Sequence, residues 1–227
     1  MGTLKLTGIR DLHNVSVLVA DLTRPPLSAA ELWQTLSPDE HARAERFRFP
    51  HLRDRFRTGR GLLRVLVAQY CKADARELAF SYTAMGKPIL PTCLDFSFNV
   101  SHSGDLFAAA VSRWGPVGID IESIRPMHDL QSLARRFFAL PEYTAIEGLD
   151  EAGRPLAFFR CWTRKEAYLK ARGDGLSKGL STFHVSCGEE ETSPICDASN
   201  LEQWVSHAFE PAPGYVGALA VISREPG

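Results

Sequence analysis

Short apolar runs predict β-strands at several places along the chain. The pattern is clearest in Val117–Glu122, where apolar and polar residues alternate with a period of two. Such alternation is typical of a strand that is buried on one face. We expect further strands over Asn14–Ala20, Phe96–Val100, Leu106–Val111 and Val216–Ile222.

Helical spacing of apolar residues predicts helices between these strands. The expected helices cover Ser28–Thr35, a segment beginning at Ser37-Pro38, Leu62–Tyr70, Asp129–Phe138 and Phe158–Arg172. Ser and Pro at two of the starts, and Gly173 after the last helix, are ordinary helix signals. Because helices and strands do not alternate regularly, the pattern favours an α+β fold over a doubly wound sheet. Cys187–Ser199 has no clear pattern and is expected to be a solvated loop.

The composition excludes some functions. The 227 residues contain 26 Lys and Arg against 27 Asp and Glu, a net charge of −1, which argues against a nucleic-acid or membrane-surface protein. No apolar run is long enough to span a membrane, and no secretion signal is apparent. The five cysteines are scattered and never spaced as CxxC, so we expect reduced, mostly buried thiols in a cytoplasmic protein.

One local charge asymmetry interrupts this neutral composition. Eight arginines lie between Arg43 and Arg64, with only Glu45 and Asp54 to oppose them. The run could form an RNA-binding face, but no recognised aromatic stacking pattern accompanies it.

Asp120 and Glu122 are the first candidates for chemistry. On a strand they project from the same face, where two carboxylates repel each other. A hard divalent cation such as Mg²⁺ would remove that repulsion. The alternative is an edge strand whose acidic face lies in water.

The segment Trp162–Lys170 is the second candidate. Helical spacing places Trp162, Glu166 and Lys170 on one face, so Glu166 could complete a set of three carboxylates. Lys165 or Lys170 could then meet a phosphate. The alternative is a surface helix with an ordinary Glu–Lys pair.

A third segment, Asn99–Gly104, reads Asn-Val-Ser-His-Ser-Gly. We expect its Ser-His-Ser-Gly part to form the turn of a hairpin that offers hydroxyls, an imidazole and N–H groups to an anion. The alternative is a turn in which Ser101 and Ser103 make only local hydrogen bonds. No hydrolase elbow, P-loop or dinucleotide fingerprint occurs in the sequence.

Together these segments resemble the 4′-phosphopantetheinyl transferases of the Sfp (surfactin) type. The resemblance extends from about Leu36 to Val185 and includes the Gly-Lys-Pro turn at 86–88 and Arg-Phe-Phe at 136–138. Its most specific part is the pair of motifs Gly-x-Asp-x-Glu and Trp-x-x-Lys-Glu-x-x-x-Lys, about 40 residues apart.

The resemblance implies a function and roles for individual residues. Members of the family transfer phosphopantetheine from coenzyme A to a serine of a carrier protein and release 3′,5′-ADP. Asp120, Glu122 and Glu166 match the Mg²⁺ ligands. Glu166 also matches the general base and Lys170 the lysine at the transferred phosphate, with Lys165 close by. The residues that match coenzyme A contacts are Arg43, Arg57, Thr58, Lys87, Ser101 and His102. Glu40 replaces a basic residue of some members, and an apparent insertion over Phe49–Thr58 makes Arg60 a rival to Arg57.

The resemblance also implies two similar α+β subdomains related by a pseudo-twofold, with coenzyme A between them. We place the subdomains at residues 1–113 and 114–227 and expect a monomer. The expected partners are apo carrier proteins of fatty-acid, polyketide or nonribosomal-peptide synthesis. Because neighbouring helix positions lie about 100° apart, we expect one of Phe137 and Phe138 to be partly exposed beside Arg135 and Arg136, as a contact for a carrier.

Two other classes remain open from the sequence. A decayed transferase could bind coenzyme A or a carrier without catalysis, although the set Asp120, Glu122, Glu166 and Lys170 is intact. A Mg²⁺-dependent phosphohydrolase would use the same carboxylates with an activated water.

Overall fold

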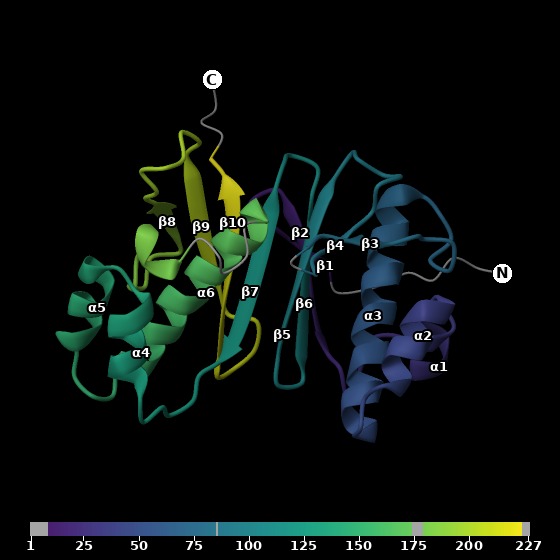
Figure 1. Cartoon of the computed structure of the whole chain (residues 1–227), viewed down its shortest axis with the longest axis horizontal. Helices are drawn as coiled ribbons and strands as arrows, with labels where there is room; N and C mark the ends of the chain where they lie inside the picture. The colour runs from purple at the N-terminus through teal and green to yellow at the C-terminus, as the bar shows by residue number, and fades with distance from the viewer. Residues whose placement is uncertain (1–8, 85, 174–178, 224–227) are drawn as a thin grey trace.

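The computed structural model describes residues 9–84, 86–173 and 179–223 (Figure 1). Helices and antiparallel strand pairs are mixed along the chain, which confirms the α+β class. Among these residues, no helix has the length and apolarity required to cross a bilayer.

The first half of the chain builds one sheet and a group of helices. The sheet has the order β1-β2-β6-β5. Its strands are β1 (Ile9–Leu12), β2 (Val15–Asp21), β5 (Ser97–Ser103) and β6 (Leu106–Ser112). The helices are α1 (Ala29–Trp33), α2 (Pro38–Glu45) and α3 (Pro50–Cys71). A small pair, β3 (Ser81–Tyr82) and β4 (Pro88–Ile89), follows α3.

The second half builds another four-stranded sheet, with the order β7-β10-β9-β8. Its strands are β7 (Val117–Ser123), β8 (Thr192–Ile195), β9 (Trp204–Phe209) and β10 (Tyr215–Ile222). The helices are α4 (Leu130–Phe137), α5 (Leu140–Glu147), α6 (Arg154–Arg172) and the short 3₁₀ turn η2 (Leu180–Thr182).

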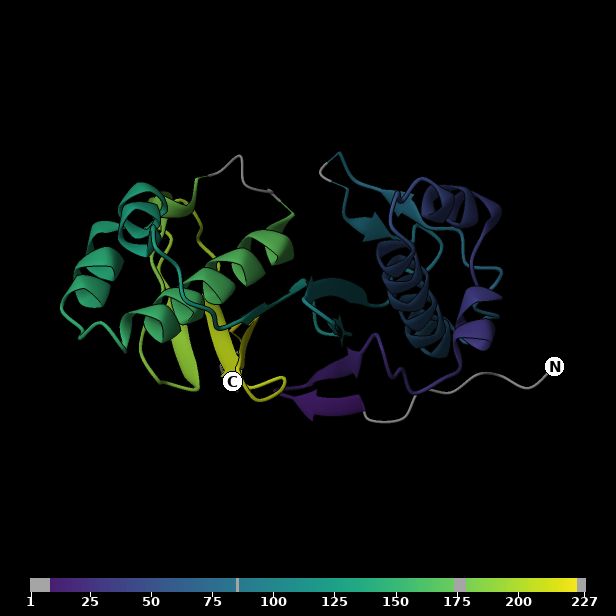
Figure 2. The same cartoon turned by 90° about the horizontal axis from the view of Figure 1, so that it is seen from below.

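The two halves share a topology. In each, a strand (β2 or β7) leads into helices that include one long helix (α3 or α6). A later hairpin (β5–β6 or β9–β10) then places its second strand beside the first strand. Seen from below, α1–α3 lie at one end of the molecule and α4–α6 at the other, with strands between them (Figure 2).

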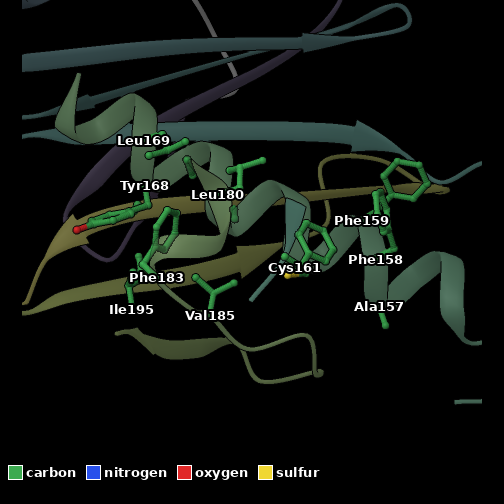
Figure 3. Packing of buried hydrophobic residues seen from close by; sticks show 14 of the residues in the cluster. Ala157, Phe158, Phe159, Cys161, Tyr168, Leu169, Leu180, Phe183, Val185 and Ile195 are labelled. Atoms are coloured by element: carbon green, nitrogen blue, oxygen red, sulfur yellow. The ribbon is translucent and has the colours of Figure 1, made fainter. Parts of the chain in front are cut away.

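Three apolar cores follow from this arrangement. Alternate residues of β2, β6, β7 and β10 form a central core where the sheets meet, with Val17, Ala110 and Ile119 among its members. The opposite faces pack against α3 in one half and α6 in the other. In the second of these outer cores, the Tyr168 and Phe183 rings lie 4.8 Å apart (Figure 3). The strand period of two therefore assigns one face of β7 to the central core and the other to α6.

Local sequence sets several helix ends. The Ser28 hydroxyl accepts the Glu31 N–H, and the Glu31 carboxylate accepts the Ser28 N–H, as a capping box requires. Gly173 ends α6 with φ +78°, a conformation that glycine adopts without strain. These ends agree with the sequence prediction.

A glycine lets α6 approach β7 closely. A Cβ atom added at Gly118 would lie 1.9 Å from the Ala167 carbonyl oxygen. Because that contact is with backbone, only glycine fits there. Gly118 thus fixes the distance between the strand that carries Asp120 and the helix that carries Glu166.

Three sequence expectations were wrong. Ser101, His102 and Ser103 belong to strand β5, and the hairpin turns at Gly104-Asp105, because the polar segment continues the strand alternation. The expected loop Cys187–Ser199 contains the short edge strand β8. Of the five cysteines only Cys161 is buried, and Cys196 is exposed.

Candidate active site

Strands β5 and β7 and helix α6 bring the sequence candidates together. Ile119 and Ile121 enter the central core, so the alternation of β7 turns Asp120 and Glu122 toward the other face. The side chain of Lys170, on α6, reaches this face and contacts Asp120. The predicted same-face geometry of the two carboxylates is therefore present.

Asp120 is a buried carboxylate with one satisfied oxygen. Its Oδ1 accepts hydrogen bonds from Lys170 Nζ at 2.6 Å and from the Ser101 hydroxyl at 2.8 Å. Its Oδ2 is buried and has no partner among the described groups. Asp120 is only 5% exposed, which contradicts the alternative of an acidic face in water.

Glu122 lies two residues further along β7 and is half-buried. Its Oε2 accepts a hydrogen bond from the Ser103 hydroxyl at 2.7 Å and a charged one from Arg125 Nη1 at 3.3 Å. The sequence had offered Ser103 only as part of a possible anion-binding turn, and Arg125 was not among the candidates.

The carboxylates influence one another electrostatically. Burial raises the pKa of Glu166, and the neighbouring Asp120 and Glu122 carboxylates raise it further, while Lys170 opposes the shift. Burial also raises the pKa of Asp120, partly offset by Lys170 and Ser101. Perturbed carboxyl groups of this kind cluster at functional sites.

Asp120, Glu122 and Glu166 provide carboxylate donors of the kind found in hard-cation sites, but they do not form a complete coordination shell. In the described ranges, no three His, Cys, Asp or Glu side chains are arranged to hold a metal ion. The donors are nonetheless carboxylate oxygens, which Mg²⁺ prefers, and Asp120 Oδ2 is buried without a partner. Asp120, Glu122 and Glu166 therefore offer the type of donor atom that a divalent cation prefers.

Lys87 joins the two halves of the molecule beside this set. Its Nζ donates a hydrogen bond to the Lys170 carbonyl oxygen at 2.7 Å. Burial, together with the charge of Lys170, lowers the pKa of Lys87 to about 8. A lysine of the β3–β4 connection is thus held at the C-terminal end of α6.

A cavity of about 400 Å³ lies against the opposite face of β5. Its apolar lining includes Phe47, Phe56, Leu63, Val100 and Phe107. Its basic and imidazole side chains are Arg43, Arg55, Arg60 and His102. An apolar cavity with several cationic groups suits a planar ring that carries phosphates.

Arg60 is the most enclosed of these cations. Its side chain is 10% exposed and its Nε pairs with Glu40 Oε1 at 3.4 Å, but its Nη1 is buried without a partner. Both carboxylate oxygens of Glu40 pair with arginines, because the second oxygen lies 3.0 Å from Arg64 Nε. Glu40 therefore orients arginines instead of contacting a ligand itself.

Arg57 and Thr58 lie outside this cavity. Arg57 forms ion pairs with Glu45 and Asp54 and stacks over Trp33, while Thr58 is 3% exposed. Arg55 and Arg60 line the cavity instead. The cavity-lining residues of α3 follow the i, i+3, i+4 spacing of one helix face, and Arg57 and Thr58 fall outside that series, which consists of Leu52, Arg55, Phe56, Gly59, Arg60 and Leu63.

Lys165 requires a correction. Its side chain is fully buried, and its Nζ binds Glu142 Oε1 and the carbonyl oxygens of Leu180 and Phe183, each at 2.7 Å. All three donor positions of the ammonium group are thereby used. Lys165 holds α6 against α5 and η2 and is not available to a phosphate.

Comparisons with known proteins agree with this architecture. A family profile described as the 4′-phosphopantetheinyl transferase superfamily matches residues 116–220, and one described as 4′-phosphopantetheinyl transferase, N-terminal, matches residues 26–113. The N-terminal match includes α1–α3, β5 and β6 but begins after β1 and β2, and the other match includes the second sheet and its helices up to residue 220.

Curated relatives extend over most of the chain. The 4′-phosphopantetheinyl transferase HetI of Nostoc sp. is 46% identical over 203 residues, which are 88% of this chain and 84% of that protein. The 4′-phosphopantetheinyl transferase psf-1 of Bacillus pumilus is 35% identical over 193 residues, 84% and 80% of the two chains. Sfp of Bacillus subtilis is 31% identical over 206 residues, 88% and 89%.

The matched profiles and the curated relatives are transferases by name. The chain belongs to the 4′-phosphopantetheinyl transferase superfamily, and its relatives include proteins of the Sfp type.

Proposed function

We propose that this protein transfers the 4′-phosphopantetheine group of coenzyme A to a serine of an apo carrier protein and releases 3′,5′-ADP. The observation that carries the proposal is the hydrogen-bonded group of Asp120, Lys170 and Ser101, beside Glu122 and Glu166. It lies next to a cavity suited to a nucleotide, and family membership supports the same reaction.

The chemistry is a displacement at the pantetheine-side phosphorus of the pyrophosphate. The carrier serine oxygen forms a bond to this phosphorus, and the bond to the bridging oxygen breaks, so that 3′,5′-ADP takes the electron pair. We assign Glu166 to accept the serine proton, because its raised pKa brings it nearer to neutral pH than an ordinary glutamate. Lys170 supplies an ammonium group to the phosphate oxygens.

Asp120, Glu122 and Glu166 are the side chains that would hold Mg²⁺. When bound, the ion supplies positive charge that offsets the charge of the pyrophosphate. The buried, unpartnered Asp120 Oδ2 supports this assignment.

For the nucleotide part of coenzyme A we propose the cavity lined by Arg43, Arg60 and His102. Arg60 Nη1 is a buried donor that lacks an acceptor, and an unsatisfied charged donor is costly unless a ligand completes it. Lys87 approaches from the β3–β4 side of the site. Ser101 is reassigned from coenzyme A to the Asp120 carboxylate, since its hydroxyl donates there.

Substitution of Arg60 by alanine should raise the KM for coenzyme A by about tenfold or more, because a charge-assisted hydrogen bond to the ligand is lost. The kcat should stay nearly unchanged. Arg57→Ala is the matched control from the same helix and should leave the KM unchanged. Steady-state kinetics with coenzyme A and with 3′-dephospho-coenzyme A measure the KM and kcat of both variants. An unchanged KM in Arg60→Ala would remove Arg60 from the nucleotide site.

The lowered pKa of Lys87 predicts an alkaline limit to coenzyme A use. A lysine that titrates near pH 8 is charged below that pH and neutral above it, so kcat/KM for coenzyme A should fall as pH rises through about 8. Lys87→Arg should extend activity to higher pH, because arginine stays charged. If the parent and this variant lose activity at the same pH, another group sets the limit.

A carrier surface is proposed on α4. Phe138 is buried at 3% exposure, whereas Phe137 is half-buried beneath Arg136, whose guanidinium lies 5.0 Å from its ring centre. Arg135 is engaged with Glu147 at 2.5 Å. An apolar contact flanked by positive charge suits the acidic surroundings of a carrier serine. We further propose a monomer, a subdomain boundary at 113/114 and a cytoplasmic location.

Intact mass spectrometry tests the function directly. The protein is incubated with coenzyme A, Mg²⁺ and an apo acyl or peptidyl carrier, and the carrier should gain the mass of one phosphopantetheine group. A carrier that stays unmodified while coenzyme A binds would favour the non-catalytic binding module. Hydrolysis of coenzyme A without carrier modification would favour the phosphohydrolase.

A further inference from the structure

Strands β5 and β7 run side by side but belong to different sheets. In the part of the chain that the structure describes, no ladder of backbone hydrogen bonds joins them. Polar side chains of β5 take the place of a ladder. The Asn99 side-chain oxygen accepts the Ile119 N–H at 3.0 Å, and the Ser103 hydroxyl accepts the Ser123 N–H at 3.1 Å.

Ser101 completes this series between Asn99 and Ser103. Its hydroxyl oxygen accepts the Ile121 N–H at 3.3 Å. The three acceptors are two residues apart on β5, and the three N–H groups are two residues apart on β7. The strands are therefore parallel neighbours in a fixed register, held by side chains.

Both serines make a second bond, and in each case to a carboxylate of the candidate site. Ser101 donates to Asp120 Oδ1 at 2.8 Å, and Ser103 donates to Glu122 Oε2 at 2.7 Å. A serine hydroxyl has one proton to donate. Because the hydroxyl oxygen already accepts a backbone N–H, the direction in which it donates that proton is largely fixed. Each β7 carboxylate is thereby tied to the backbone of the residue that follows it.

This arrangement opposes the natural tendency of the two carboxylates. Asp120 and Glu122 lie on one face of a strand and repel each other, so without partners their side chains would rotate apart. Buried partners that hold ligating carboxylates commonly change metal affinity by about 10- to 100-fold.

We propose that Ser103 is a positioning residue for Glu122, and that Ser101 and Ser103 together hold the two β7 carboxylates in the geometry of a divalent-cation site. The inference rests on the proposed function and extends it to residues that touch neither substrate. Ser103 gives the cleaner test, because Ser101 also lies 3.1 Å from Lys170 Nζ.

Three variants separate positioning from a merely structural role. Ser103→Ala removes the hydroxyl, and Ser103→Thr keeps it. Ser206→Ala removes another buried strand hydroxyl, whose partner in the described part of the chain is Ser193. Mn²⁺ binding is measured by electron paramagnetic resonance, with and without coenzyme A and without carrier. The KM values for Mg²⁺ and for coenzyme A at saturating Mg²⁺ are measured separately.

Ser103→Ala should bind Mn²⁺ about tenfold more weakly and raise the KM for Mg²⁺, with an unchanged KM for coenzyme A at saturating Mg²⁺. Ser103→Thr should restore parental binding, and Ser206→Ala should match the parent. Parental Mn²⁺ affinity in Ser103→Ala, with or without a loss of thermal stability, would overturn the inference. If the parent itself neither binds Mn²⁺ nor modifies a carrier, the proposed function fails instead.

Discussion

Replacement of Asp120 by asparagine should abolish transfer while the protein remains folded. Asparagine has the same shape but cannot offer a negative charge to Mg²⁺ or to Lys170, whose Nζ lies 2.6 Å from Asp120 Oδ1. Loss of one preorganised charged group at a reacting centre costs a factor of about 100 to 1,000 in rate. Displacement of Lys170 from the phosphate would add to this loss.

The same substitution should leave the free energy of unfolding nearly unchanged. Burial raises the pKa of Asp120, which means that the folded protein disfavours its charged form. Removal of that charge relieves this cost and offsets the loss of the Lys170 contact. A stable but inactive protein is the signature of a residue kept for function.

Intact-mass assays at saturating coenzyme A, together with thermal unfolding, measure the two effects. Asp11→Asn is a suitable control, since Asp11 lies on β1 at the edge of the first sheet and, among the described residues, its side chain bonds to Ser16 alone. A kcat close to that of the parent at moderate Mg²⁺ would exclude Asp120 from the metal set. An unfolded variant would show a structural role in its place.

The sequence was most informative where periodicity and chemistry coincide. The alternation of Val117–Glu122 predicted a strand and the common face of Asp120 and Glu122, and both are present. Regular spacing over Phe158–Arg172 predicted α6, which extends four residues further toward its N-terminus. Long periodic segments can be predicted from sequence alone, because apolar residues recur at regular spacing along their buried face.

Short edge strands gave no such signal. Strand β8 contains four residues, one of them Pro194, and pairs on one side only with β9. Proline is tolerated at a sheet edge, where its missing N–H breaks no ladder. Its place in the fold depends on pairing with β9, the next strand of the chain, and its own four residues do not encode that pairing.

The role of Ser101 and Ser103 could be predicted from the sequence only in part. The spacing of Asn99, Ser101 and Ser103 marks one face of a strand, once the segment is recognised as a strand and not a turn. That this face meets β7 is a tertiary fact, since the two strands belong to different sheets. Likewise, the arginine run indicates anion binding, but only packing separates Arg60 from Arg57.

The two lysines of the helical motif illustrate the same limit. Lys165 and Lys170 are five positions apart, so on a helix with about 100° per residue they point roughly 140° away from each other. Lys170 shares its face with Glu166 and reaches Asp120. Lys165 points instead into the core of the second half of the molecule, where it forms an ion pair with Glu142. The sequence places the lysines on different faces but does not say which face is buried.

Lys165→Met should therefore destabilise the protein by about 3–5 kcal/mol, the usual cost of removing one partner of a buried ion pair. The substitution leaves the Glu142 carboxylate enclosed at 2% exposure, and its remaining donors among the described residues are the N–H groups of Val185 and Ala139. The KM for coenzyme A should stay at the parental value at a temperature where the variant is folded. Denaturant unfolding measures the loss. The double variant Lys165→Met with Glu142→Gln should recover part of it, because the uncompensated charge is then gone. A raised KM for coenzyme A with parental stability would return Lys165 to the substrate site, against the three contacts that now hold it in the core.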